Sequence, residues 1–116
     1  MAIHGLLHIA LLTRDLKKTE KFYTDVLGLK VAFRVPPEMV FLRTPGTKDL
    51  LNFVLTKKKI SPERGLQHFG FKTSSSGLKQ LEKRLKQKQI KLEGRRGKSA
   101  IYFRDPNGYS IEYYSD

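Results

Sequence analysis

Polar and apolar residues alternate most clearly near the C-terminus, on both sides of a short turn sequence. Asp105 to Gly108, DPNG, contains residue types that adopt tight-turn conformations, and the β-branched and aromatic runs around it predict a β-hairpin from residue 101 to 114. Side chains in a strand alternate between two faces, so the apolar residues share one face while Tyr102 and Glu112 share the other. A carboxylate in a sheet interior needs a metal ion or hydrogen-bond donors, which makes Glu112 the first candidate functional residue.

The first half of the chain predicts elements in the order β-α-β-β-β. Residues 5–13 are mostly apolar and predict a buried strand. Asp15 is expected to cap a helix with an apolar stripe, and Gly28 is expected to end it. Apolar or alternating runs then predict strands at residues 29–35, 39–44 and 50–55.

The same order of elements is predicted again in the second half. Residues 66–73, LQHFGFKT, are similar to residues 6–13, LLHIALLT. Ser76 is expected to cap a second helix with leucines facing inward and lysines outward, followed by strands at 90–93, 100–104 and 110–114. We therefore expect one α+β domain of two tandem βαβββ modules, with module 1 at about 1–56, a linker at 57–65 and module 2 at about 66–116.

The repeat aligns residues that carry chemistry. If the two modules lean their sheets together, their first and last strands meet, and two imidazoles and one carboxylate converge on one point. Such a set holds a divalent metal and leaves coordination positions open for substrate or water, so the predicted metal ligands are His8, His68 and Glu112. A shift of 60 residues relates His8 to His68, the small residue Ala10 to Gly70, and Asn52 to Glu112.

Composition narrows the classes of protein. The chain has 116 residues and no cysteine, which excludes disulfides and thiolate ligands and leaves nitrogen and oxygen atoms to hold any metal. No apolar run approaches the roughly 20 residues of a membrane span, and the N-terminus does not resemble a signal peptide, so a cytoplasmic protein is expected. The net charge of +12 is compatible with an anionic small-molecule substrate or with nucleic acid.

Four further residues are candidates at the site, each with an ordinary alternative. Tyr102 shares a strand face with Glu112 and is a candidate hydrogen-bond donor or acid, or else a packing residue. Asn52 is expected to contact substrate or line the cavity, with a weak metal ligand as the other reading. Arg95 and Arg96 precede the last hairpin and are candidate contacts to an anionic substrate, although charged loops are often simply solvated.

Several stretches together resemble the vicinal-oxygen-chelate superfamily, which includes glyoxalases, bleomycin- and fosfomycin-resistance proteins and extradiol dioxygenases. The stretches are HIALLTRD with KTEKFYTDVLGLKV, then QHFGFKT, and finally YFRDPNGYSIEY, and they cover nearly the whole chain. The resemblance implies a glyoxalase-like fold with a cupped mixed sheet, often paired in a homodimer. It also places the family's metal positions on His8, His68 and Glu112.

No subfamily matches at every position. Glyoxalase I commonly has a second glutamate where this chain has Asn52, and an amide cannot act as a base. Fosfomycin thiol transferases use a lysine and a serine at positions that fall on Leu92 and Arg96. Extradiol dioxygenases match at Tyr102 but add histidines, for which the corresponding positions hold Asn52 and the region 93–95.

The sequence therefore predicts a divalent-metal-dependent enzyme acting on a small molecule, with the metal chelating two neighbouring substrate oxygens. A lyase or isomerase and an extradiol-type dioxygenase both remain open, and the donor set is compatible with Fe, Mn, Ni, Zn or Co. One alternative is a non-catalytic binding or bleomycin-resistance protein of the same fold. The other is a nucleic-acid-binding basic protein, which we do not favour because no recognition motif accompanies the charge.

Overall fold

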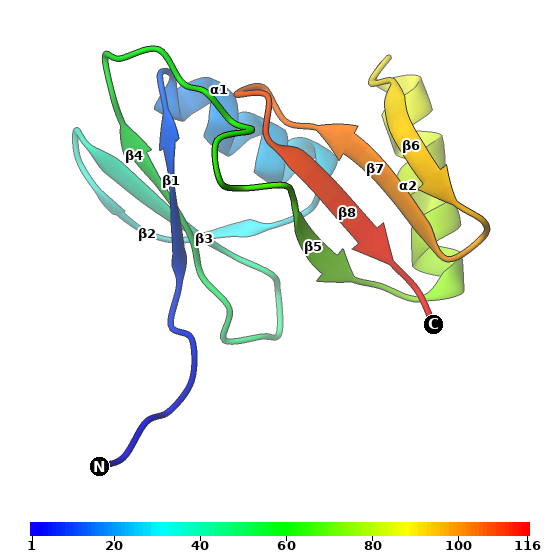
Figure 1. Ribbon diagram of the computed structural model, residues 1–116, viewed down its shortest axis with the longest axis horizontal. Helices are drawn as coiled ribbons and strands as arrows, with labels where there is room; N and C mark the ends of the chain where they lie inside the picture. The colour runs from blue at the N-terminus through cyan, green and yellow to red at the C-terminus, as the bar shows by residue number, and fades with distance from the viewer. The chain divides into compact units, whose positions relative to one another are not determined.

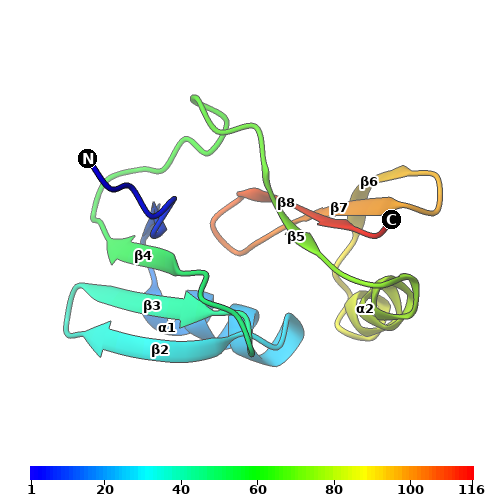
Figure 2. The ribbon, with the colours of Figure 1, turned by 90° about the horizontal axis from the view of Figure 1, so that it is seen from below.

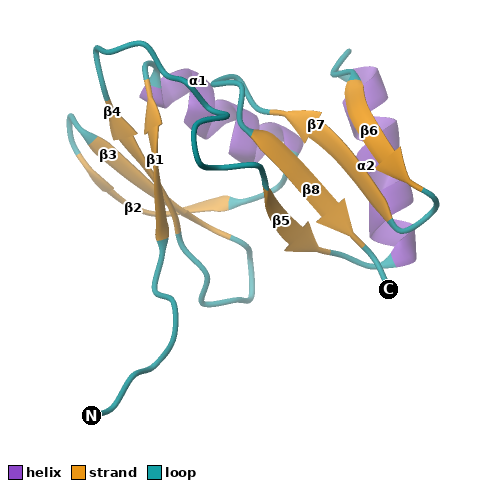
Figure 3. Ribbon diagram, in the orientation of Figure 1, coloured by secondary structure: helices purple, strands orange, loops and turns teal.

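The computed structural model describes residues 1–116 as two compact units, Met1–Ile60 and Ser61–Asp116. Each unit contains one four-stranded mixed sheet and a helical segment (Figures 1 and 3). The first unit contains β1 (Ile9–Thr13), α1 (Leu16–Lys21), η1 (Phe22–Val26), β2 (Lys30–Val35), β3 (Met39–Arg43) and β4 (Leu51–Leu55). The second contains β5 (Phe69–Lys72), α2 (Ser75–Gln87), β6 (Leu92–Arg96), β7 (Ala100–Arg104) and β8 (Ser110–Tyr114).

The two sheets have the same topology. The strand order is β1-β4-β3-β2 in the first unit and β5-β8-β7-β6 in the second. In each, the first strand of the unit pairs in parallel with the last, and the remaining pairs are antiparallel. Figure 2 shows β4, β3 and β2 side by side, as this order requires. The prediction of an α+β fold built from two tandem βαβββ modules is confirmed.

Local sequence explains the helical segment of the first unit. The Asp15 side chain caps α1 by accepting a hydrogen bond from the Lys18 amide at 3.0 Å. The helix then widens into the π-helical turn η1, which places Tyr23 in the core beside Phe53, with ring centroids 5.1 Å apart. Gly28 follows with a φ of 75°, a conformation that ends helices and favours glycine.

The second unit separates an apolar face from a polar face of its sheet. The leucines of α2 are buried, and α2 packs against β7, as Figure 2 shows. Ile101, Phe103 and Ile111 are fully buried, whereas the alternate residues Tyr102 and Glu112 are only partly covered. This alternation leaves one face of the sheet available for chemistry.

Some predicted boundaries were wrong. The first strand is Ile9–Thr13 rather than 5–13, and it is mostly exposed because β1 is an edge strand paired only with β4. The cap of α2 is Ser74 rather than Ser76, since the Ser74 hydroxyl accepts a hydrogen bond from the Gly77 amide. The strand expected at 90–93 lies at Leu92–Arg96.

Both sheets are interrupted at equivalent places. The β2–β3 register shifts between Val31 and Phe33, and the β6–β7 register shifts between Leu92 and Gly94. Such a bulge inserts one residue and changes which side chains share a face.

Neither helical segment has the length and apolarity that crossing a membrane requires.

Candidate functional site

The candidate site begins with a row of residues across the second sheet. Glu112 on β8 pairs with Gly70 on β5 and with Tyr102 on β7, and Tyr102 in turn pairs with Gly94 on β6. Residues that are directly opposite in register have neighbouring side chains on the same face. The two glycines leave space on either side, so Glu112 and Tyr102 are the only side chains in this row.

The two carboxylate oxygens of Glu112 have different surroundings. Oε2 accepts hydrogen bonds from the Tyr102 hydroxyl at 2.5 Å and from Arg96 at 3.2 Å. Oε1 faces the Nε2 atom of His68 at 3.6 Å, which is longer than a hydrogen bond. The His68 ring also packs edge-on against Tyr102, with ring centroids 5.6 Å apart. One oxygen therefore orients the carboxylate, and the other is presented to the histidine.

The contact with Glu112 also changes the acidity of Tyr102. The hydrogen bond to the carboxylate raises the pKa of Tyr102 above its usual value, and desolvation and the negative charge of Glu112 act in the same direction. The phenol therefore keeps its proton throughout the neutral range. In this state it is a hydrogen-bond donor or an acid rather than a base.

Gly70 keeps the space beside Glu112 open. A Cβ atom at this position would lie 3.2 Å from Oε1 of Glu112, so even an alanine would crowd the oxygen that faces His68. An imidazole nitrogen and a carboxylate oxygen are suitable donors for a divalent metal, and these two fit as part of such a site. The structure gathers no cluster of three or more histidine, cysteine, aspartate or glutamate side chains, so this is a pair of donors rather than a full ligand set.

The first unit carries a matching arrangement with different chemistry. Asn52 on β4 pairs with Ala10 on β1 and with Phe41 on β3, as Glu112 pairs with Gly70 and Tyr102. The ring of His8 packs edge-on against Phe41, with centroids 5.7 Å apart. His8 and Asn52 thus occupy the positions in their own unit that His68 and Glu112 occupy in theirs. The convergence of His8 with the pair in the second unit stays a prediction.

Asn52 has an unsatisfied polar atom. The residue is only 4% exposed, and its Oδ1 atom is buried without a hydrogen-bond partner. Its Nδ2 makes only a long contact, 3.9 Å, to the sulfur of Met39. A buried carbonyl oxygen without a donor typically costs about 1–3 kcal/mol. This oxygen is therefore a natural acceptor for a donor supplied from outside the chain.

The two candidate arginines lie on opposite faces of β6. Arg96 shares the face of Glu112 and lies over the ring of Tyr114, 5.5 Å from its centroid. Arg95 instead forms an ion pair with Glu82 of α2 at 2.5 Å. The structure therefore brings Arg96, Tyr102, His68 and Glu112 together and leaves Arg95 out of that group.

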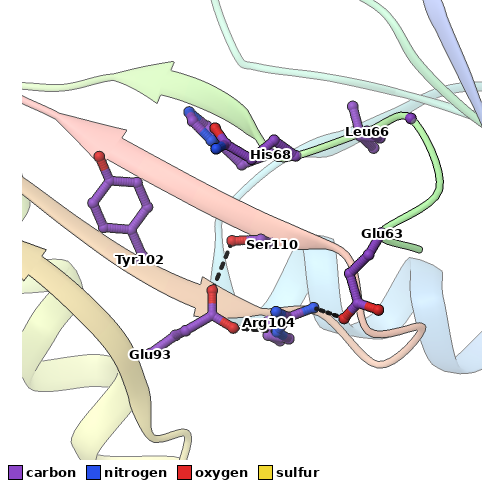
Figure 4. A pocket seen from close by; sticks show the side chains of 9 residues that line it. Glu63, Leu66, His68, Glu93, Tyr102, Arg104 and Ser110 are labelled. Carbon is purple, nitrogen blue, oxygen red and sulfur yellow. Dashed lines mark hydrogen bonds and ion pairs between the residues drawn. The ribbon is translucent and has the colours of Figure 1, made fainter. Parts of the chain in front are cut away.

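An open pocket of about 670 Å³ adjoins His68 and Tyr102. Figure 4 shows that its wall includes an ionic network which sequence reasoning missed: Arg104 bridges Glu93 and Glu63, and the Ser110 hydroxyl donates to Glu93. Strand alternation would have placed Arg104 beside Tyr102 and Ser110 beside Glu112. No such rule would have found Glu93, because it occupies the bulge of β6.

The network keeps Glu93 charged. Burial raises the pKa of Glu93, but the hydrogen bonds from Ser110 and Arg104 outweigh it and lower the pKa overall. Arg104 also donates to the carbonyl oxygen of Gly108 at 2.7 Å, which ties the network to the turn between β7 and β8. The wall of the pocket is therefore polar and held in place by ionic hydrogen bonds.

Comparison with known proteins identifies the family of this chain. Residues 5–113 match the model of the Glyoxalase/Bleomycin resistance protein/Dioxygenase superfamily. The chain belongs to this superfamily. The resemblance found in the sequence is thereby confirmed, and with it the glyoxalase-like fold.

Three relatives of this superfamily member illustrate its range. The chain is 27% identical to a metallothiol transferase, FosB, from Lysinibacillus sphaericus, over 99% of this chain and 84% of that protein. It is also 27% identical to a glutathione transferase, FosA, from Serratia marcescens, covering 97% and 81% of the two chains. Among solved structures, an integron cassette protein from the mobile metagenome of the Halifax Harbour sewage outfall has a TM-score of 0.82 and 27% identity, covering 98% and 100%.

Proposed function

We propose that this protein is a divalent-metal-dependent enzyme acting on a small molecule, with the metal held by His8, His68 and Glu112. The observation that carries the proposal is that the two carboxylate oxygens of Glu112 have different partners. Oε2 accepts hydrogen bonds from Tyr102 and Arg96, while Oε1 faces His68. Carboxylate ligands of metals are commonly oriented by such hydrogen bonds to the second oxygen. Membership of the superfamily and the names of the two transferases support a metal-dependent enzyme in general terms.

When bound, the metal would act as a Lewis acid toward two neighbouring substrate oxygens. The chain's own residues would prepare the site around it. Tyr102 holds a proton on its hydroxyl and orients Glu112. Arg96, which is largely exposed, would contact a negatively charged substrate group, and the buried Oδ1 of Asn52 would accept a hydrogen bond from the substrate.

Within this class we favour lyase, isomerase or transfer chemistry over ring cleavage by oxygen. The pocket beside Tyr102 is lined by a single histidine, His68, and the raised pKa of Tyr102 keeps its hydroxyl protonated at neutral pH, where it donates a hydrogen bond. The similarity to two transferases points in the same direction. The metal remains open among Fe, Mn, Ni, Zn and Co, because histidine and carboxylate suit each of them.

We also propose a homodimer. The N-terminal segment exposes large apolar side chains, with Ile3 at 76%, Leu6 at 82% and Leu7 at 67% exposure, and it leads into the edge strand β1. Apolar residues beside an open strand edge are typical of surfaces that pair with another chain. Sedimentation equilibrium would test this, and a monomer at micromolar concentration would contradict it.

Elemental analysis tests the metal centre directly. The protein would be purified without chelators or a metal-binding tag, beside His8→Ala, His68→Ala and the control His4→Ala, which changes the third histidine of the chain. We expect near one metal per chain in the wild type and the control and little in the other two variants. If neither purification nor reconstitution with the five candidate metals loads the wild type, the proposal is wrong and a metal-free binding protein becomes the better interpretation.

A further inference from the structure

The helical segments of the two units differ strongly in charge. Residues 15–28 contain three cationic and three acidic residues and are balanced, whereas residues 74–91 contain six cationic residues and one acid, a net charge of +5. Both segments have the same place in the βαβββ order. The excess charge on α2 is therefore not something that this fold requires.

The charge also carries a local cost. Lys79 and Lys83 are four residues apart on α2, as are Arg84 and Lys88 around its C-terminal end, and like charges at this spacing destabilise a helix by a few tenths of a kcal/mol. The single acid, Glu82, is already engaged by Arg95. Lys79, for example, is exposed and forms no ion pair.

Two depressions are lined by residues of α2 and by residues in or next to β6, the outer strand of its sheet. The first, of about 420 Å³, is lined by Lys79, Glu82, Arg95 and Lys98 together with Ser75 and Leu78. The second, of about 260 Å³, is lined by Lys86 and Lys91 and shares Glu82 with the first. We call the two depressions together the α2–β6 groove.

We propose that the α2–β6 groove binds the phosphate backbone of a nucleic acid. Five cations, of which Arg95 is paired with Glu82, are spread over the two depressions, and this fits several phosphates of one chain better than a single small anion. The lining contains no aromatic side chain, so bases would not stack there and binding would depend little on sequence. The leucines of α2 are buried, which leaves its surface without an apolar anchor for a lipid bilayer.

Fluorescence anisotropy with a labelled 20-nucleotide single strand and a 20-base-pair duplex of mixed sequence tests the proposal. The test variant is the triple change Lys79→Gln, Lys86→Gln, Lys91→Gln. The control is Lys57→Gln, Lys58→Gln, Lys59→Gln, which removes the same charge from exposed lysines before the second unit. Affinity would be measured from about 50 to 200 mM salt, because each phosphate contact adds about 0.7 to 0.9 to the slope of log affinity against log salt.

We expect the wild type to bind both probes with a dissociation constant in the micromolar range at about 150 mM salt. The groove variant should bind at least tenfold more weakly with a shallower salt slope, and the control should stay within about twofold. Equal losses in both variants would attribute binding to net charge alone and overturn the proposal. So would the absence of binding at that salt, or tighter binding of vesicles containing phosphatidylserine than of either oligonucleotide. Metal content should be unchanged in the groove variant, so this test is independent of the proposed enzyme.

Discussion

The two units share a backbone plan, and each carries a histidine beside its sheet, yet only the second adds a carboxylate and a phenol at the corresponding positions. In the first unit His8 packs on Phe41, and Asn52 lies opposite Ala10. In the second unit the equivalent residues are His68, Tyr102, Glu112 and Gly70. The fold therefore specifies where these side chains lie but not which residue types they are.

Residues that support the fold are more alike in the two units. The outer strand of each sheet sends an arginine to a glutamate of its helix: Arg34 pairs with Glu20 at 2.9 Å, and Arg95 pairs with Glu82 at 2.5 Å. Both outer strands also contain a bulge next to this arginine. The ion pair between outer strand and helix is therefore common to both units, whereas the residues of the candidate site differ between them.

Replacement of the carboxylate of Glu112 should have the largest effect on metal affinity. Glu112→Gln removes the carboxylate charge while keeping its shape, and it makes the second unit resemble the first, which has a neutral amide at Asn52. We expect metal affinity to fall by at least about tenfold, because a neutral amide is a much poorer ligand. Metal titration by calorimetry would measure this. The matched change Asn52→Leu should leave most of the metal affinity intact, and an unchanged affinity in Glu112→Gln would contradict the assignment.

A smaller loss is expected for Tyr102→Phe, which also brings the second unit closer to the first, where Phe41 has this position. Removing one hydrogen bond from Oε2 of Glu112 should weaken metal binding several-fold, less than in Glu112→Gln. Metal titration at neutral pH gives the comparison. Equal affinity in wild type and Tyr102→Phe would reduce this tyrosine to packing.

The hydroxyl of Tyr102 should also appear in a pH titration. Because the folded protein raises its pKa, the stability that this group contributes is complete below pH of about 10, the unfolded value, and is lost as the pH rises through the folded value. The tyrosinate absorbance of the five tyrosines should therefore include a transition above the usual tyrosine range, which Tyr102→Phe removes and Glu112→Gln moves downward. A transition at the same pH in Glu112→Gln would show that the carboxylate is not its cause.

Exchanging the small residues Gly70 and Ala10, which have the same place in the two units, should change metal affinity less. Gly70→Ala places a methyl group 3.2 Å from Oε1 of Glu112, so the carboxylate must shift by a few tenths of an ångström. We expect metal affinity to fall by a few-fold, with the fold retained. Ala10→Gly, the reverse change in the first unit, is the control and should leave metal affinity nearly unchanged. A Gly70→Ala variant that binds metal as tightly as the wild type would show that the open space is unnecessary.

The smallest effects, on stability, are expected for the arginine–glutamate ion pair that both units contain. The hydrogen bond from Arg95 lowers the pKa of Glu82, so the stability from this pair is present above the unfolded pKa of about 4.5 and is lost as the pH falls through the folded value. Glu82→Gln should lower the melting temperature slightly at pH 7, and the difference from the wild type should shrink as the pH falls below about 4.5. Glu20→Gln, which removes the matching ion pair of the first unit, should also cost little at pH 7. Both pairs are exposed, so a large loss in either variant would contradict this account.

The sequence alone was enough for the order of elements and for the family. Alternation placed Tyr102 and Glu112 on one face of the hairpin, and the DPNG turn and the capping Asp15 identified where elements begin and end. These features depend on residues close together in the chain, whose spacing alone determines their side of a strand or helix. The N-terminal extent of β1 was not predictable in this way, because a strand extends only as far as its backbone finds a pairing partner, here β4 from Ile9 onward.

Tertiary structure decided what surrounds Glu112. Pairing of β5, β7 and β8, which are distant in sequence, determines that Gly70 opens one side of the carboxylate while Tyr102 holds the other. The bulge in β6 puts Glu93 on the pocket wall, whereas Arg95 and Arg96 lie on opposite faces of the sheet through ordinary strand alternation. Composition and spacing supply the donors, but register between distant strands determines which of their atoms are held and which are left available, because register is a property of the assembled sheet.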